Sequence, residues 1–353
     1  MTYIVTVFSN FLLLIIFKNN WIPRVLFLLM LAFLSYSYVD LADYDGYVQM
    51  YEGPQGNLSG LEFLEKTEIG FRSLIYISNY LGIKFEIFKL LIYLVFGFIL
   101  VNSLLSIDRK STNFVLCMYI LYPMILDLVQ IRHFMAMSIF LFGFSQILKS
   151  ISSNSYPIKG FILLFFSTLF HSSFVILIIF VFFALFFIKF IYLKQFFLKT
   201  IILLTLSFLV VSFLIVLVNL NGIDYFLTNT SKETIVFYGI IYSFFYIVAF
   251  LVKNRINNLH SSKEFSFVFI YITLLVGATF PLLFFNVEFF RFFRVSMIIL
   301  LSTMFSILVS KHNFINGLYV ISIMISYTLL AVAIFYIYYL PNLIIPFYFN
   351  GSI

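Results

Sequence analysis

Long apolar segments alternate with short polar ones along almost the whole chain. Runs of apolar residues lie at about 3–17, 22–39, 86–106, 112–127, 134–148, 161–188, 197–218, 235–252, 265–286, 293–309 and 314–338. Because about 20 apolar residues form a helix that crosses a bilayer, most of these runs have the length of a transmembrane helix. The pattern predicts an all-α polytopic integral membrane protein with about 11 to 12 transmembrane helices.

The sixth run is too long for a single crossing. Its 28 residues would span about 42 Å as one helix, whereas the hydrocarbon core is about 30 Å thick. His171, Ser172 and Ser173 interrupt it near the middle. Two short helices joined there would put the basic residues before and after the run on the same side, as the positive-inside rule favours. We therefore expect a hairpin broken at His171, twelve crossings, and both termini outside.

The composition leaves no room for an independent soluble domain. Of the 353 residues, 63% are apolar and only 10% are charged, against about a quarter charged in soluble domains. The net charge of +7 comes from basic residues scattered between apolar runs, which is typical of topology determinants and not of nucleic-acid binding. We expect one transmembrane domain over residues 1–353, an acidic external loop at 40–85 that contains an amphipathic helical segment, and a second external loop at 219–234.

The motifs of several enzyme classes are missing from the sequence. There is no GxxxxGK[ST], HExxH, GxSxG or CxxC, and the one cysteine is Cys117. ATP-driven transport, zinc peptidase and serine hydrolase activities therefore lose support. In the predicted topology the unusual Asp, His and Arg residues gather on the external face. Ionisable groups near a bilayer persist mainly where they have a partner or a ligand, so we expect the protein to act there.

An acidic segment with regularly spaced tyrosines follows the second run. Asp43, Tyr47 and Tyr51 are spaced i, i+4, i+8 and would share one face of a helix. A carboxylate beside phenol rings suits a sugar, whereas an interfacial tyrosine belt is the alternative. Asp43-Tyr44-Asp45 also matches the DxD pattern with which nucleotide-sugar enzymes hold a metal, but three residues specify little, and we expect no metal.

Two further segments carry candidate groups. Glu68 and Arg72 stand at i, i+4, which favours a surface ion pair, and Gly70 between them would allow another backbone to approach closely. The segment Asp127 to His133 joins two apolar runs and predicts an abrupt turn. That turn would hold Arg132 near the lipid headgroups, where a guanidinium can bind phosphate oxygens; pairing with Asp127 is the alternative.

Histidines and a late arginine pair complete the set. His133 suits either a proton shuttle or a structural role. His171, at the break of the sixth run, suits either a catalytic base or a cap of the helix hairpin, with Ser172 or Ser173 supplying hydrogen bonds. Arg291 and Arg294 follow Glu288 at three-residue spacing, with four phenylalanines that would anchor the segment in the membrane interface. One of these arginines could bind an external anion such as a lipid diphosphate.

The order of these motifs resembles a known family. Asp43-x-x-x-Tyr47 follows an early helix, Glu68-x-Gly70-aromatic-x-x-Leu comes next, an arginine turn runs into an alanine-bearing helix at Arg132, and His171-x-Ser follows. This arrangement over about residues 40–175 resembles the EpsG-like branch of the Wzy-type polysaccharide polymerases. His133 departs from that pattern, which often has Gln after the arginine.

The resemblance implies a multi-pass enzyme of the bacterial cytoplasmic membrane whose active site faces the periplasm or exterior; a GT-C-like helical bundle is one architecture open to it. The enzyme would join undecaprenyl-diphosphate-linked oligosaccharide repeat units into O-antigen, capsule or exopolysaccharide by inverting transfer. No metal, other cofactor or nucleotide sugar is expected. Membrane lipid, a chain-length regulator and a flippase are the further partners it suggests, and nucleic acid is not.

The reaction implied by the resemblance assigns roles to the candidate residues. His171, or alternatively Asp43, would accept the proton of the attacking hydroxyl, and Arg132, Arg291 and Arg294 would stabilise the departing diphosphate. Arg291 and Arg294 would thereby bind substrate, as would the remaining candidates: His133, Tyr47, Tyr51, Glu68, Arg72, Asp127 and Gln130. Three other activities use similar groups, namely an O-antigen ligase, a flippase for the lipid-linked repeat unit and a multipass acyltransferase; the clustering of arginines on one face and the lack of an internal repeat weigh against the flippase.

Overall fold

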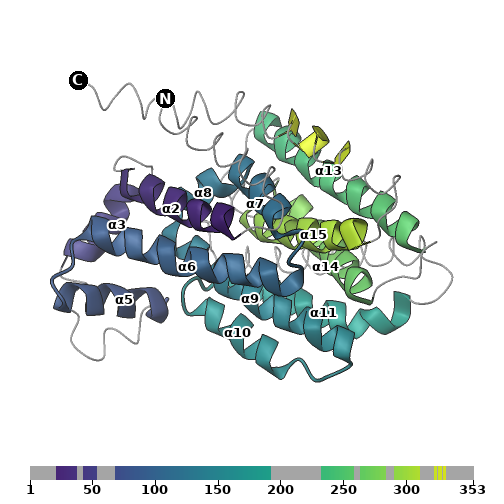
Figure 1. Cartoon of the computed structure of the whole chain (residues 1–353), viewed down its shortest axis with the longest axis horizontal. Coiled ribbons are helices and arrows are strands. Elements are labelled where there is room, and N and C mark those ends of the chain that lie inside the picture. Colours follow the sequence, from purple (N-terminus) through teal and green to yellow (C-terminus); the bar gives the residue numbers. More distant parts are fainter. Residues whose placement is uncertain are drawn as a thin grey trace, which may run out of the picture. The chain divides into compact units, whose positions relative to one another are not determined.

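The computed structural model describes residues 21–37, 43–53, 68–191, 232–257, 263–283 and 290–310, together with seven residues between 322 and 330 (Figure 1). These residues form helices and turns, and no strand occurs among them. The helices are α2 Ile22–Ser37, α3 Tyr44–Glu52, α5 Ile69–Tyr80, α6 Phe85–Ile107, α7 Thr112–Leu121, α8 Met124–Val129, α9 Ile131–Ser153, α10 Ile158–Thr168, α11 Phe174–Ile191, α13 Lys232–Asn257, α14 Lys263–Leu282 and α15 Phe290–Ser310.

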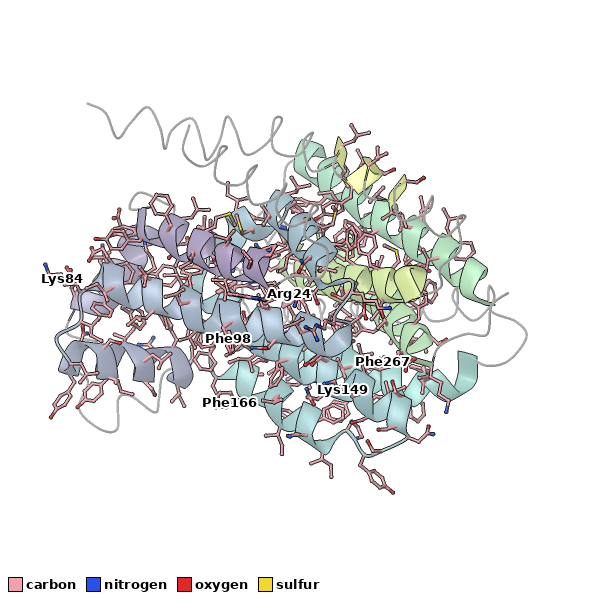
Figure 2. All side chains as sticks on the ribbon, in the orientation of Figure 1. Arg24, Lys84, Phe98, Lys149, Phe166 and Phe267 are labelled. Atoms are coloured by element: carbon pink, nitrogen blue, oxygen red, sulfur yellow. The ribbon has the colours of Figure 1, made fainter. Side chains whose placement is uncertain are left out.

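Several of these helices have the character of membrane spans. Three are long and apolar enough to cross a bilayer, at Phe85–Ile107, Ile131–Ser153 and Lys263–Phe280, and five shorter apolar helices accompany them in the described part of the chain. One face of α6 exposes an apolar stripe of the kind that faces lipid, made of Ile87, Leu91, Val95 and Phe98. Phe98 is labelled in Figure 2. The all-α polytopic membrane fold is therefore confirmed. The runs at 3–17 and 197–218 and most of 314–338 lie outside the described residues, and so does nearly all of the loop at 219–234.

The chain divides into two compact units. The first comprises Met1–Ser150, Tyr156–Phe174 and Phe305–Ile353, and the second comprises Ile151–Ser155 and Val175–Met304. The prediction of a single transmembrane domain stays a prediction. Within the first unit α2 packs along α6 (Figure 1). Gly97 of α6 lets Leu31 come so close that a Cβ on Gly97 would lie 2.9 Å from Cδ2 of Leu31.

Two helix breaks shape the first unit. The sixth run is interrupted as expected, because α10 ends at Thr168 and α11 begins at Phe174. The run at 112–127, expected to be continuous, is divided into α7 and α8 at Tyr122-Pro123, since proline lacks the N–H that a helix interior needs. Only Gln130 then separates α8 from α9. Arg132 and the residue after it therefore lie in the first turn of α9 and not in a preceding loop.

Two glycines let α9 and α10 cross backbone to backbone. A Cβ on Gly143 would lie 2.9 Å from both the Gly160 oxygen and the Leu164 nitrogen, and a Cβ on Gly160 would lie 2.4 Å from Ile147. Small residues at such a crossing bring backbones into direct contact, which is how helices commonly associate in lipid. The contact fixes α10, and the loop that follows it, against α9.

In the second unit an aromatic cluster joins α13 to the start of α15. The rings of Tyr242 and Phe293 stack at 3.9 Å, and the rings of Tyr238 and Phe290 lie 4.2 Å apart. Phe290, Phe292 and Phe293 are buried. The sequence prediction that this segment anchors the membrane interface through its phenylalanines is wrong for these three, because they fill the interior of the unit. Glu288 and Phe289 lie outside the described residues.

Candidate functional site

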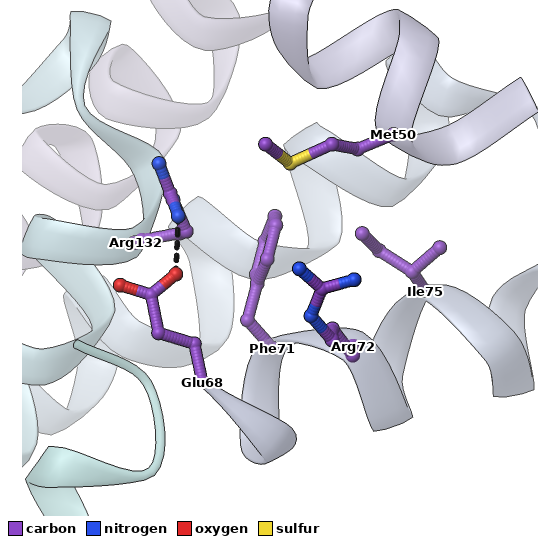
Figure 3. Close-up of a pocket in the computed structure, with 6 residues that line it drawn as sticks. All are labelled: Met50, Glu68, Phe71, Arg72, Ile75 and Arg132. Atoms are coloured by element: carbon purple, nitrogen blue, oxygen red, sulfur yellow. Dashed lines mark hydrogen bonds and ion pairs between the residues drawn. The ribbon is translucent and has the colours of Figure 1, made fainter. Parts of the chain in front are cut away.

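Three segments far apart in the sequence bring a carboxylate, a guanidinium and an imidazole together in the first unit. Glu68 precedes α5, Arg132 lies in the first turn of α9, and His171 lies in the loop after α10. One carboxylate oxygen of Glu68, Oε2, forms an ion pair with the Arg132 guanidinium (Figure 3). The other oxygen, Oε1, lies 3.5 Å from Nδ1 of His171, and the Ser173 hydroxyl lies 3.0 Å from the same nitrogen.

The pairing differs from what the sequence spacing favoured. Arg72 was the expected ion-pair partner of Glu68, but the partner is Arg132, 64 residues further on. The alternative pairing of Arg132 with Asp127 is also not what forms. Local spacing predicted the wrong partner because the fold brings the start of α9 to the start of α5.

An unusual backbone conformation aims Glu68 at its partners. Its φ of 68° and ψ of 45° lie in the left-handed region, which a residue with a Cβ seldom adopts. Two residues later, the Gly70 N–H donates to the Leu169 carbonyl oxygen at 2.8 Å. A Cβ on Gly70 would lie 3.0 Å from that oxygen, so the close backbone approach predicted at Gly70 is confirmed.

Behind these groups lies a second, fully buried carboxylate and imidazole pair. Oδ1 of Asp127 is 3.3 Å from Nδ1 of His133, and the two side chains are only 1% and 2% exposed. The Tyr119 hydroxyl donates to Oδ2 of Asp127 at 2.9 Å. The Tyr93 hydroxyl lies 2.8 Å from the Asp127 and Leu128 carbonyl oxygens. These hydrogen bonds hold Asp127 and Leu128, near the end of α8, in place.

The two imidazoles meet edge to face. The ring centroids of His133 and His171 are 5.9 Å apart at an interplanar angle of 87°. Phe174, the first residue of α11, lies beside both rings at 5.3 and 6.0 Å. The second pair is thus in contact with the Glu68 site while it is shielded from solvent.

Helix α3 contributes aromatic groups to the same region. Tyr47 and Tyr51 are buried as expected for one face, and the Tyr47 ring centroid lies 5.6 Å from the Arg132 guanidinium carbon. The Tyr51 hydroxyl donates to the Ile83 carbonyl oxygen at 2.6 Å, which gives it a structural role. Asp43 is the exposed N-cap residue and so does not share the buried face. Burial raises the pKa of Tyr47, and the neighbouring Arg132 charge opposes that shift, so the phenol stays protonated at neutral pH.

A pocket opens beside Arg132. It is a small opening at the surface and is lined by Met50, Glu68, Phe71, Arg72, Ile75 and Arg132. In Figure 3 the Phe71 ring stands between the Glu68–Arg132 pair and the Arg72 guanidinium. Two cations against one carboxylate, with apolar walls, suit an anionic group attached to an apolar molecule. Phe71 and Ile75 were missed from the sequence, although their i, i+4 spacing marks the buried face of α5.

A comparison with known protein families identifies the family of the chain. The EpsG family matches residues 20–349 of the chain. The chain belongs to the EpsG family. No curated protein and no solved structure matches it. EpsG membership indicates a polymerase-type enzyme of polysaccharide synthesis, in agreement with the multi-pass helical fold.

Three other candidate residues of this EpsG protein do not line the pocket. Gln130 is partly buried and continues the backbone hydrogen bonding from α8 to α9, accepting from Phe134 N–H at 3.0 Å. Arg291 and Arg294 belong to the second unit, where Arg294 is 1% exposed and Arg291 is partly exposed. Among the residues that the structure describes, no cluster of three or more His, Cys, Asp or Glu side chains could hold a metal.

Proposed function

We propose that this EpsG protein polymerises undecaprenyl-diphosphate-linked oligosaccharide repeat units into a surface polysaccharide. The proposal places the reaction at the external face of a bacterial cytoplasmic membrane. The observation that carries it is the arrangement at the pocket: Arg132 and Arg72 line an opening with apolar walls, and His171 lies across Glu68 from Arg132. The Glu68 carboxylate thus contacts both the arginine of the anion site, Arg132, and the candidate base, His171.

The chemistry needs one bond made and one bond broken at a sugar. The hydroxyl oxygen of the acceptor repeat unit attacks the anomeric carbon of the donor chain, and its proton passes to the His171 imidazole. The bond between that carbon and the diphosphate oxygen breaks, and its electron pair stays on undecaprenyl diphosphate. Attack opposite to the leaving group inverts the anomeric centre. General-base assistance of this kind typically contributes about 10²–10⁴-fold.

The arginines stabilise the negative charge that develops on the leaving group. Negative charge builds up on the diphosphate as the bond breaks, and a fixed guanidinium stabilises it without reorganisation. Arg132 is held for this by Glu68 and by the Tyr47 ring, yet its side chain remains 31% exposed. Arg72 lines the same pocket and supplies the second cation for a group that carries two phosphates.

The test uses the full-length protein in detergent with a chemically defined undecaprenyl-diphosphate repeat unit. Wild type is expected to yield a ladder of repeat-unit multiples without nucleotide sugar and in the presence of EDTA. Arg132→Ala and His171→Ala are expected to abolish the ladder. Lys84→Ala is the matched control, because Lys84 is exposed in the loop before α6 (Figure 2).

Other products would overturn the proposal. Transfer of a single unit to a different acceptor would indicate a ligase, and an acylated sugar would indicate an acyltransferase. Movement of the intact lipid across liposomes without any ladder would indicate a flippase. A ladder that requires a divalent cation would contradict the metal-independent reaction.

A further inference from the structure

The Glu68 side chain contacts both the proposed anion-binding group and the proposed base. Its two carboxylate oxygens divide between them: Oε2 pairs with Arg132, and Oε1 lies 3.5 Å from Nδ1 of His171. The carboxylate is only 9% exposed, so its charge is weakly screened by solvent. A change at one partner must therefore alter the electrostatic environment of the other.

The backbone at Glu68 supports a functional reason for this residue. Among the described non-glycine residues only Glu68 and Asn154 have a positive φ, and asparagine tolerates that conformation far better than glutamate does. A left-handed glutamate is strained, because its Cβ crowds the neighbouring carbonyl oxygen. Glycine would relieve this strain but would remove the carboxylate. Strain of this kind concentrates at functional sites, where the surrounding structure holds the residue in place.

We propose that Glu68 is a positioning residue that couples lipid-diphosphate binding at Arg132 to activation of His171. The inference rests on the proposed function and concerns the same site. Without substrate, the Glu68 charge is largely neutralised by Arg132. A diphosphate entering the pocket competes for that guanidinium, and the Glu68 carboxylate then acts mainly on His171. A carboxylate beside Nδ1 stabilises the imidazolium that forms when the acceptor hydroxyl gives up its proton.

The titratable groups seen beside His171 fit this exchange. The His171 ring faces Glu68 from the start of α5 and His133 from α9, and His133 is itself paired with Asp127 of α8. The Asp127–His133 pair is buried, and neither residue lines the pocket. Glu68 is the carboxylate whose pairing a ligand at the pocket can alter.

The decisive experiment separates KM from kcat in Glu68→Gln. Glutamine keeps the size and one acceptor oxygen but removes the charge. We expect kcat for ladder formation to fall about 10- to 100-fold, because the imidazolium loses its stabilising partner. KM for the lipid should stay equal or fall, because Arg132 is no longer neutralised. Glu68→Asp, which keeps the charge on a shorter side chain, should recover part of kcat, and Glu52→Gln at the exposed end of α3 is the matched control.

If Glu68 only held Arg132 in place, Glu68→Gln would change KM and leave kcat unaltered. An increase of KM by tenfold or more with kcat unchanged in Glu68→Gln would overturn the coupling. So would an equal loss of activity and thermal stability in both Glu68 variants, since that would mark a structural residue.

Direct binding of undecaprenyl diphosphate requires no turnover and keeps this inference separate from the proposed function. Binding by Glu68→Gln that equals or exceeds wild type supports the exchange at Arg132, and tenfold weaker binding contradicts it. A wild type that binds the lipid but forms no ladder would refute the polymerase alone.

Discussion

The backbone of Gly70 hydrogen-bonds directly to that of Leu169, with the Gly70 N–H donating to the Leu169 carbonyl oxygen at 2.8 Å. This contact ties the start of α5 to the end of α10. Glu68 lies two residues before it on one chain segment, and His171 lies two residues after it on the other. The spacing between the carboxylate and the imidazole therefore depends on how closely these two backbones approach.

Gly70→Ala should lower activity more than its small size suggests. The new Cβ would lie 3.0–3.2 Å from three atoms of Leu169, so one backbone must shift by a few tenths of an ångström. We expect a loss of about 1–3 kcal/mol in the free energy of unfolding and a clear drop in ladder formation. Thermal unfolding in detergent and the ladder assay measure the two effects.

Gly46→Ala is the matched control for that substitution. Gly46 lies within α3, is exposed, and has nothing within 4 Å of its would-be Cβ. Alanine favours a helix interior by about 1 kcal/mol over glycine. Stability should therefore stay equal or rise. If both alanine variants behave alike, the Gly70 contact is not what positions the site.

Arg132→Lys should behave unlike a conservative change. Lysine keeps the positive charge but lacks the planar fork that binds two phosphate oxygens at once. We expect kcat/KM for the lipid substrate to fall about 10- to 100-fold, since a fixed donor to the developing charge is lost. Steady-state kinetics with the defined lipid measure it. Full activity of the lysine variant would show that a point charge is sufficient.

The buried pair should be important for stability in a way that depends on hydrogen bonding. Asp127→Ala removes the acceptor of the Tyr119 hydroxyl and the partner of His133, and should cost about 3 kcal/mol in the free energy of unfolding. His133→Gln keeps a polar side chain of similar reach, and it introduces the residue that the family pattern often has there. We expect that variant to unfold near the wild-type temperature and to keep the ladder. Loss of the ladder in a stable His133→Gln protein would give His133 a role in catalysis.

Stability should fall at high pH partly through Tyr47. An unfolded phenol ionises near pH 10, whereas burial raises the pKa of Tyr47 in the folded protein. Above pH 10 the unfolded state has lost a proton that the folded state keeps, so the free energy of unfolding decreases as pH rises. Tyr47→Phe should show a shallower decrease between about pH 9.5 and 11. Tyr80→Phe, at a position 83% exposed, should leave the slope unchanged.

Features set by local sequence were predictable. The run at 86–106 matches α6 within a residue at each end, because nothing within it breaks a helix. The break near His171 followed from a length that no single crossing could use. The close approach at Gly70 followed from the lack of a side chain. Each of these depends on residues within one segment.

Features set by tertiary contacts were not predictable. Glu68 and Arg132 are 64 residues apart, and no spacing rule connects them. The phenylalanines at the start of α15 have the pattern of an interfacial anchor, but which surface they meet depends on Tyr238 and Tyr242 of α13. The break between α7 and α8 is an intermediate case, since Pro123 was visible in the sequence as a signal that ends a helix.

The crossing of Gly143 and Gly160 acts on the site from a distance. Arg132 lies eleven residues before Gly143 on α9, and His171 lies eleven residues after Gly160. At 1.5 Å per helical residue the α9 arm from Gly143 to Arg132 is about 16 Å long, so a rotation of about 5° at the crossing would move its tip by about 1.4 Å. Displacements of that size alter rates strongly. The two glycines thus set the angle at which α9 and α10 cross. A methyl group added at either glycine would displace Arg132 relative to His171, and so change catalysis, without contacting any reacting group.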